Sequence, residues 1–291
     1  MTAFHWFHPL MACLMLAGLL PLLHRRLHPR VSAVVLAASV VWITTVAVVG
    51  IWLLAFRYIA HVNWFAAQLQ WCSMIVGAHG TVSAWVGIPA VGASLAGLVR
   101  AWRFWKVQRT LRSSRLRGTS VVATDEVFAF VVPGPDAATI VSSGLLRHLG
   151  PEEQEVVFAH ERAHADHRHD RYLTIGRAAE ALLPIIRPLT RRLEFSLERW
   201  ADDAAVTAVN GNRMLVARTI AKVALLPHRA LGPALGFSGL GDAARAEFLL
   251  DPPARSRSLT VLAIVSSVVG LSFAVYQLHH FEALFNALCR T

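Results

Sequence analysis

The chain has 291 residues, of which 55% are hydrophobic and only 16% are charged, and this balance excludes an ordinary soluble globular protein. The formal net charge of +10 leaves three classes of partner open: nucleic acid, an acidic protein or an anionic membrane surface. Cys13, Cys72 and Cys289 form no CxxC pair, so neither a disulfide framework nor a thiolate metal site is predicted. A single Cys72–Cys289 bridge stays open.

Four apolar segments are predicted to cross a bilayer, at residues 4–23, 31–56, 76–99 and 258–278. The second is the strongest, because it has no charged residue and exceeds the roughly 20 residues that a spanning helix needs. Basic residues follow the first segment instead of preceding it. This order is the reverse of a cleaved signal peptide, so we expect the first segment to stay in the protein.

Basic residues also predict the orientation. They gather after the first and third spans, at residues 24–30 and 100–117, and excess Lys and Arg mark the cytoplasmic side. We therefore expect a plasma-membrane protein with the N-terminus outside and residues 100–257 inside. The run at 100–117 favours a helix on anionic lipid, with Trp102 and Trp105 at the interface. No nucleic-acid recognition motif accompanies it, so no direct nucleic-acid binding is expected.

The region between the third and fourth spans has the composition of a soluble domain. Residues 126–132 and 138–144 are rich in β-branched and aromatic residues and predict a two-stranded hairpin. A helix is predicted from residue 151 to about 183, since the sequence Gly-Pro-Glu-Glu opens it well. A second long helix is predicted from about residue 189 past 209. The Gly- and Pro-rich stretch 227–243 predicts a loop.

The sequence HERAH at residues 160–164 lies inside the first of these helices. Side chains four residues apart share one helix face, so His160 and His164 can hold one zinc ion together. A glutamate directly after the first histidine, here Glu161, can act as the general base for a water molecule. The pattern predicts a catalytic zinc site in which Glu161 is the catalytic residue.

A catalytic zinc needs a third protein ligand and an open fourth position. The next helix carries LERWADDAAV, which makes Glu198 the predicted third ligand, with Glu194 as the substitute. Asp202 lies one turn further along and is predicted to accept a hydrogen bond from a ligand histidine and orient it. His167 as a fourth ligand would close the site and make it structural.

Other polar residues near the motif receive weaker assignments. His169 and Asp170 are expected to form surface pairs with neighbouring arginines. The transition state of peptide hydrolysis needs a donor to its oxyanion, and Tyr172, Arg199 and His167 are all candidates for that donor.

Residues 119–210, with FVVPG, IVSSGLLRHLGPEEQEVVFAHERAHADHRHD and LERWADDAAV, resemble the membrane-anchored gluzincin metallopeptidases. Among these, the chain most resembles the BlaR/MecR-type β-lactam sensor-transducers, and HtpX-type and CAAX-protease enzymes share the pattern. The resemblance implies zinc on His160, His164 and Glu198 with Glu161 as base. It also implies that the hairpin at 126–141 offers a strand edge to an extended peptide.

The span layout also resembles the sensor-transducers, with one departure. Only residues 279–291 follow the last predicted span, where those proteins carry a penicillin-binding domain, so covalent sensing of β-lactams by that route is not expected. Cleavage of a cytoplasmic winged-helix repressor is implied by analogy alone.

The expected fold is a mainly α membrane protein of about four transmembrane helices, with a cytoplasmic α+β zincin-like metalloprotease domain inserted between spans three and four. The expected order is an N-terminal membrane domain (1–99), a basic juxtamembrane helix (100–118), the metalloprotease domain (119–257), the fourth transmembrane helix (258–278) and a short extracytoplasmic tail (279–291).

The expected function is zinc-dependent hydrolysis of a protein or peptide substrate by a protein that also contacts membrane lipids. An HtpX-like quality-control protease is a close variant. Two other classes stay open: a non-catalytic membrane signal transducer with structural zinc, and an adaptor that binds lipid or DNA through residues 100–117. An intact Glu161 argues against structural zinc, which has no use for a base, and the adaptor predicts a function that survives loss of His160.

Overall fold

The computed structural model describes residues 24–61, 82–112, 118–132, 138–226, 235–236, 241–252 and 257–289. The predicted span at residues 4–23 lies outside this part of the chain. Cys72 does too, so the question of a Cys72–Cys289 bridge stays open. Most of the predicted loop at 227–243 is also outside it.

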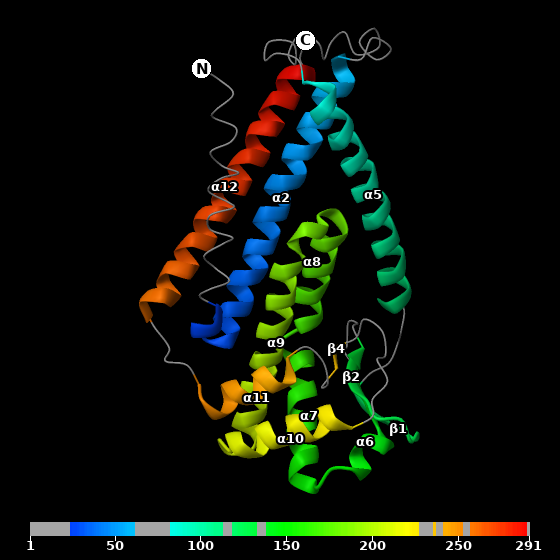
Figure 1. Ribbon diagram of the computed structural model, residues 1–291, viewed down its shortest axis with the longest axis vertical. Helices are drawn as coiled ribbons and strands as arrows, with labels where there is room; N and C mark the ends of the chain where they lie inside the picture. The colour runs from blue at the N-terminus through cyan, green and yellow to red at the C-terminus, as the bar shows by residue number, and fades with distance from the viewer. Residues whose placement is uncertain are drawn as a thin grey trace.

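Three long helices form one end of the molecule: α2 (Pro29–His61), α5 (Ala84–Arg112) and α12 (Arg257–Cys289). In Figure 1, α2 lies between α12 and α5. Within the described residues, α2 and α5 are long and apolar enough to cross a membrane, whereas the apolar stretch of α12, Arg257–Ser272, is shorter than this test requires. These helices suggest that the protein associates with a membrane.

Helix α5 continues beyond the predicted third span. It runs without a break from Ala84 to Arg112, so residues 100–112 extend the apolar helix instead of starting a separate one. The sequence from residue 98 to 112 contains no glycine or proline that would interrupt a helix. Trp102 and Trp105 are both exposed.

A small mixed sheet forms the opposite end. Its strands are β1 (Thr119–Val122), β2 (Ala129–Val132), β3 (Ala138–Ser142) and β4 (Leu235–Gly236), in the order β1-β3-β2-β4. The antiparallel β2–β3 pair confirms the predicted hairpin. However, β1 pairs with β3, and β4 pairs with β2. The outer edge of β3 is therefore occupied by β1, and that of β2 is covered by β4 at Phe130 and Val131. At these positions the chain itself pairs with the hairpin, contrary to the expectation of an edge that is open to a peptide.

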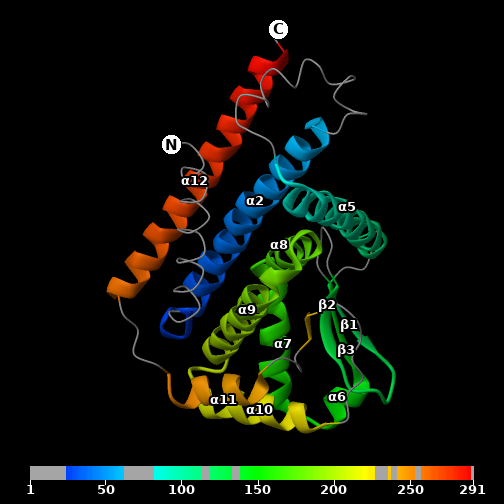
Figure 2. The ribbon, with the colours of Figure 1, turned by 45° about the horizontal axis from the view of Figure 1, so that its top comes forward.

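Helices α7 (Pro151–Asp166), α8 (His169–Leu182) and α9 (Arg187–Ala208) lie between the two ends, and α6 (Ser143–Arg147), α10 (Arg213–Leu225) and α11 (Asp242–Leu250) lie at the end with the sheet (Figure 1). Short 3-10 turns lie at His24–Arg26 and Pro184–Ile186. Figure 2 shows the sheet on one side of α7 and α9 on the other. Helix α9 confirms the second predicted helix. Helix α11 begins inside the predicted loop.

The prediction of one continuous helix over 151–183 was wrong. Helix α7 ends at Asp166 and α8 begins at His169. The break is made by Arg168, whose backbone is left-handed with φ 53° and ψ 44°. No glycine or proline marks this position, so periodicity alone did not reveal it. The break turns α8 away from the axis of α7 and places His169 differently from a continuous helix.

Two hydrophobic cores share α9. The first packs the sheet, α7 and α10 against the C-terminal part of α9 around Ala205 and Val206. The second packs α2 and α8 against its N-terminal part around Leu193 and Leu197. A hydrogen bond of 2.8 Å between the hydroxyls of Ser32 and Ser196 also joins α2 to α9. The segment of α9 between the two cores is therefore held from both sides.

Gly144 offers a test of the corner between β3 and α6. A Cβ built there would overlap the backbone carbonyl oxygens of Asp125 and Glu126, and backbone atoms cannot move aside cheaply. We expect Gly144→Ala to lower the free energy of unfolding by about 1–3 kcal/mol. Gly150→Ala is the matched control, because its Cβ would meet nothing closer than 3.8 Å. Equal denaturation midpoints for the two variants in detergent would contradict the close packing of Gly144 against the backbone of Asp125 and Glu126.

Candidate metal centre

The two histidines of HERAH face one another on α7. His160 and His164 are both buried, and their Nε2 atoms lie 3.0 Å apart. Residues four apart in a helix lie on the same face, and Val156 and Val157 one turn earlier pack into the first core. That packing presses this face of α7 against α9, so both imidazoles point toward α9 and not toward solvent.

Glu198 completes a group of three ligand atoms. Its Oε2 lies 3.4 Å from Nε2 of His160, and its Oε1 lies 3.6 Å from Nε2 of His164. The ligand atoms of these three residues all lie within 4.8 Å of one another. The ligands of a tetrahedral zinc, at bond lengths of about 2.0–2.1 Å, are roughly 3.3 Å apart. The residues present therefore fit a metal ion bound by two imidazoles and one carboxylate.

Glu161 is a buried residue whose hydrogen-bonding capacity is unused by the described part of the chain. Its side chain is fully buried, and neither oxygen has a hydrogen-bond partner among the described residues. Burial raises the pKa of Glu161 to about 8. Such an arrangement is costly for stability, but a general base that must accept a proton from a water molecule needs free lone pairs and a raised pKa.

Asp202 lies behind His160, as its predicted orienting role requires. Oδ1 of Asp202 is 3.0 Å from Nδ1 of His160, the nitrogen that faces away from Glu198. Burial opposes a charge on His160, but hydrogen bonds and attraction from Asp202 and Glu198 outweigh burial and raise the pKa of His160 to about 9. Metal ligation requires the neutral imidazole. A metal would therefore displace a proton from this histidine at neutral pH.

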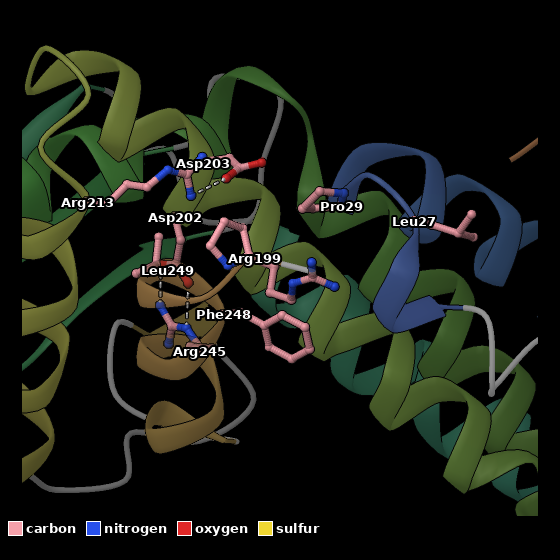
Figure 3. Close-up of a pocket in the computed structure, with 10 residues that line it drawn as sticks. Leu27, Pro29, Arg199, Asp202, Asp203, Arg213, Arg245, Phe248 and Leu249 are labelled. Carbon is pink, nitrogen blue, oxygen red and sulfur yellow. Dashed lines mark hydrogen bonds and ion pairs between the residues drawn. The ribbon is translucent and has the colours of Figure 1, made fainter. Parts of the chain in front are cut away.

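Arg245 on α11 is a residue of the centre that the sequence did not reveal. Its guanidinium is almost completely buried and donates two hydrogen bonds to Asp202, from Nε at 2.9 Å and from Nη2 at 2.7 Å. Figure 3 shows this paired contact. Its Nη1 lies 3.1 Å from Oε2 of Glu198 and 3.1 Å from Oδ1 of Asp242. Arg245 follows Asp202 by 43 positions, so no local motif connects the two residues.

The charges around Arg245 compensate one another. Burial alone would raise the pKa of both Asp202 and Glu198, but Arg245 outweighs it and holds both below their ordinary values. In return, these carboxylates raise the pKa of Arg245 above its usual value despite burial. Both acids are therefore ionised at neutral pH, the state in which Glu198 can bind a metal.

His169 is also part of the centre, and the expectation of a surface pair was wrong. It is fully buried, and its Nδ1 lies 2.7 Å from Nδ1 of His164. Burial lowers the pKa of His169 to about 3, and burial also lowers the pKa of His164 well below its ordinary value. Both rings are therefore neutral at physiological pH.

The remaining candidates lie elsewhere. Glu194 is outside the ligand group, and the charges that act on it are those of Arg177, Glu180, Glu198 and Arg191. The three candidate oxyanion donors each lie against an aromatic ring, so the geometry favours none of them. The ring of His167 stacks on Trp200 at 4.7 Å, Tyr172 lies 6.3 Å from Trp200, and the guanidinium of Arg199 lies 4.2 Å from the ring of Phe248.

A pocket adjoins the centre on the side away from the histidines. It is lined by residues of α9, α10, α11 and the start of α2, including Asp202, Arg245 and Phe248 (Figure 3). None of the residues of HERAH lines it. This pocket therefore borders the support of the metal centre and not its ligand atoms.

The Arg245 contacts lead to a testable consequence. Arg245→Met should leave two buried carboxylates without their cation, and breaking a buried pair costs about 3–5 kcal/mol. Arg213→Met is the control, because Arg213 is partly exposed and its ion pair with Asp203 is long, at 3.9 Å. Such an exposed pair is worth about 0–1 kcal/mol. Urea unfolding of the two detergent-solubilised variants measures the difference. Equal losses in the free energy of unfolding would show that the contacts of Arg245 do not stabilise the metal centre.

Comparison with known proteins gives one match. Residues 100–185 match the model of Peptidase family M48. No curated protein and no solved structure matches the chain. The matched segment includes the HERAH sequence but ends before α9, so the match does not cover Glu198, Asp202 or Arg245. Residues 100–185 are thus similar to Peptidase family M48, and together with the convergent ligand atoms this match suggests a metallopeptidase.

Proposed function

We propose that this protein is an integral membrane zinc metalloendopeptidase that hydrolyses peptide bonds in a cytoplasmic or membrane-proximal protein. One observation carries the proposal. Three ligand atoms from His160, His164 and Glu198 converge inside the protein, beside the buried carboxyl group of Glu161, which has no hydrogen-bond partner in the described part of the chain. A structural metal site needs ligands but has no use for such a base.

The roles of the residues follow from their positions. A zinc ion, when bound, supplies Lewis acidity to the peptide carbonyl and to the attacking water. Glu161 accepts the proton of that water and later donates it to the leaving amine. Asp202 holds the ring of His160 so that Nε2 faces the centre, and Arg245 keeps Asp202 and Glu198 ionised.

We also propose that the metal centre faces the cytoplasm of a bacterial cell and that the chain crosses the plasma membrane several times. The basic residues after the first and third apolar segments support this orientation, and the apolar helices α2 and α5 support a membrane location. The resemblance to sensor-transducers makes a cytoplasmic repressor one candidate substrate, by analogy. Broad cleavage of damaged membrane proteins, as in HtpX-type enzymes, is the alternative within the same activity.

Glu161→Gln tests the catalytic claim. The substitution keeps the size of the side chain and the ligands but removes the base, so we expect proteolysis to fall by roughly 10²–10⁴-fold while zinc content stays unchanged. Peptide ends in cells that carry the wild type or the variant would be compared by mass spectrometry, and zinc would be measured on the purified proteins. Few cleavages lost would indicate a specific substrate, and many would indicate quality control.

Glu155→Gln is the matched control for this experiment, because Glu155 is an exposed residue of the same helix. It should leave the peptide ends as in the wild type. Identical profiles for wild type and Glu161→Gln, with zinc bound in both, would favour the non-catalytic signal transducer.

The orientation can be tested with a membrane-impermeant maleimide. Leu225 at the end of α10 is 86% exposed, so a Leu225→Cys variant presents an accessible thiol on the domain of the metal centre. In a chain whose Cys13, Cys72 and Cys289 are replaced by serine, we expect this thiol to react only after the cells are permeabilised. Labelling of Leu225→Cys in intact cells would contradict the cytoplasmic placement.

A further inference from the structure

We propose that His169 is a positioning residue that fixes the proton of His164 on Nδ1 and so keeps Nε2 of His164 free for the metal. The inference rests on the proposed function, since it concerns a ligand of the proposed zinc. It assigns a role to a buried histidine outside the ligand group. It also explains why the helix breaks between α7 and α8.

The positions of the nitrogen atoms determine which ring donates. Nε2 of His164 lies 3.0 Å from Nε2 of His160 and 3.6 Å from Oε1 of Glu198, so this nitrogen is the ligand atom. Nδ1 of His164 lies 2.7 Å from Nδ1 of His169, a separation that requires one hydrogen between the two atoms. A neutral imidazole carries one proton. That proton must sit on Nδ1 of His164, with His169 as acceptor.

This assignment also places the proton of His169. Because its Nδ1 accepts, the neutral ring carries its hydrogen on Nε2. That nitrogen is buried and has no hydrogen-bond partner among the residues that the structure describes. A buried donor without a partner lowers the stability of the fold. The ring of His169 therefore destabilises the protein at Nε2, while its Nδ1 contacts the ligand residue His164.

The two ligand histidines are therefore supported differently. His160 has the carboxylate of Asp202 behind it, which is paired in turn with Arg245. His164 has a neutral imidazole behind it. Glu161, Glu198 and Asp202 already bring three carboxyl groups to the centre, and a fourth behind His164 would add a further buried acid. A neutral acceptor orients the ring without adding charge.

The helix break is what makes this contact possible. Five residues along a continuous α-helix would rotate His169 by about 140° from His164, onto another face. The left-handed backbone of Arg168 instead lets α8 start at His169 and return this ring to His164. Trp200 then packs against the His169 ring at 4.8 Å, and the rings of Tyr172 and His167 lie 6.5 and 5.9 Å away. The ring is held in place from several sides.

Zinc affinity measured by chelator competition on the full-length protein in detergent tests this role directly. His169→Phe keeps an aromatic ring against Trp200 but cannot accept a hydrogen bond. We expect it to weaken zinc binding by roughly 10–100-fold, the usual effect of losing a residue that orients a metal ligand. His169→Asn supplies a carbonyl oxygen as acceptor and should recover most of the loss. His167→Phe is the control, since His167 stacks on Trp200 without touching a ligand, and should bind zinc as the wild type does.

The outcomes separate the two claims. Equal zinc affinity in wild type and His169→Phe, or an equal loss in His169→Phe and His169→Asn, would overturn the role of His169 as acceptor. Failure of the wild type to bind zinc would instead overturn the proposed function. If His169→Phe does not fold, as judged by circular dichroism, His169→Leu takes its place in the same comparison with His169→Asn.

Discussion

The metal centre depends on one buried cation. Glu198 and Asp202 lie inside the protein, where ionised carboxylates are too costly unless they are paired. Arg245 contacts both and keeps both ionised. Without this guanidinium, Glu198 would tend to hold its proton and would be a poor ligand, and Asp202 would lose the charge that attracts the proton of His160. The positions of α9 and α11 relative to each other are therefore set by an electrostatic requirement of the site.

Helix α9 connects the metal centre to the two hydrophobic cores. It carries Glu198 and Asp202 between two hydrophobic cores, one shared with the sheet and α7, the other with α2 and α8. Because α2 is an apolar helix long enough to span a membrane, the second core joins that helix to the helix of the third ligand. Under the proposed function, the membrane helices and the catalytic centre pack as neighbours and share side-chain contacts.

Around the ligands, each imidazole is oriented by a different chemistry. His160 relies on a charged acceptor that is part of the Arg245 network, and His164 on a neutral ring held among aromatic side chains. The buried Glu161 is the exception, since it has no partner among the described residues. A buried base with unused hydrogen-bonding capacity is suited to receiving a water molecule and a substrate.

The sequence by itself determined the features that depend on local spacing. HERAH on a helix, the β2–β3 hairpin, the apolar helix α2, and Glu198 with Asp202 one turn apart all follow from residues within a few positions of each other. Contacts between distant segments were decided by the tertiary structure: Arg245 lies 43 positions after Asp202 with no local motif between them, and β4 covers part of a strand edge from far along the chain. The position of His169 could not be predicted from the sequence for another reason. A left-handed arginine without a glycine or proline leaves no periodic signal, yet it alone decides which face that histidine occupies.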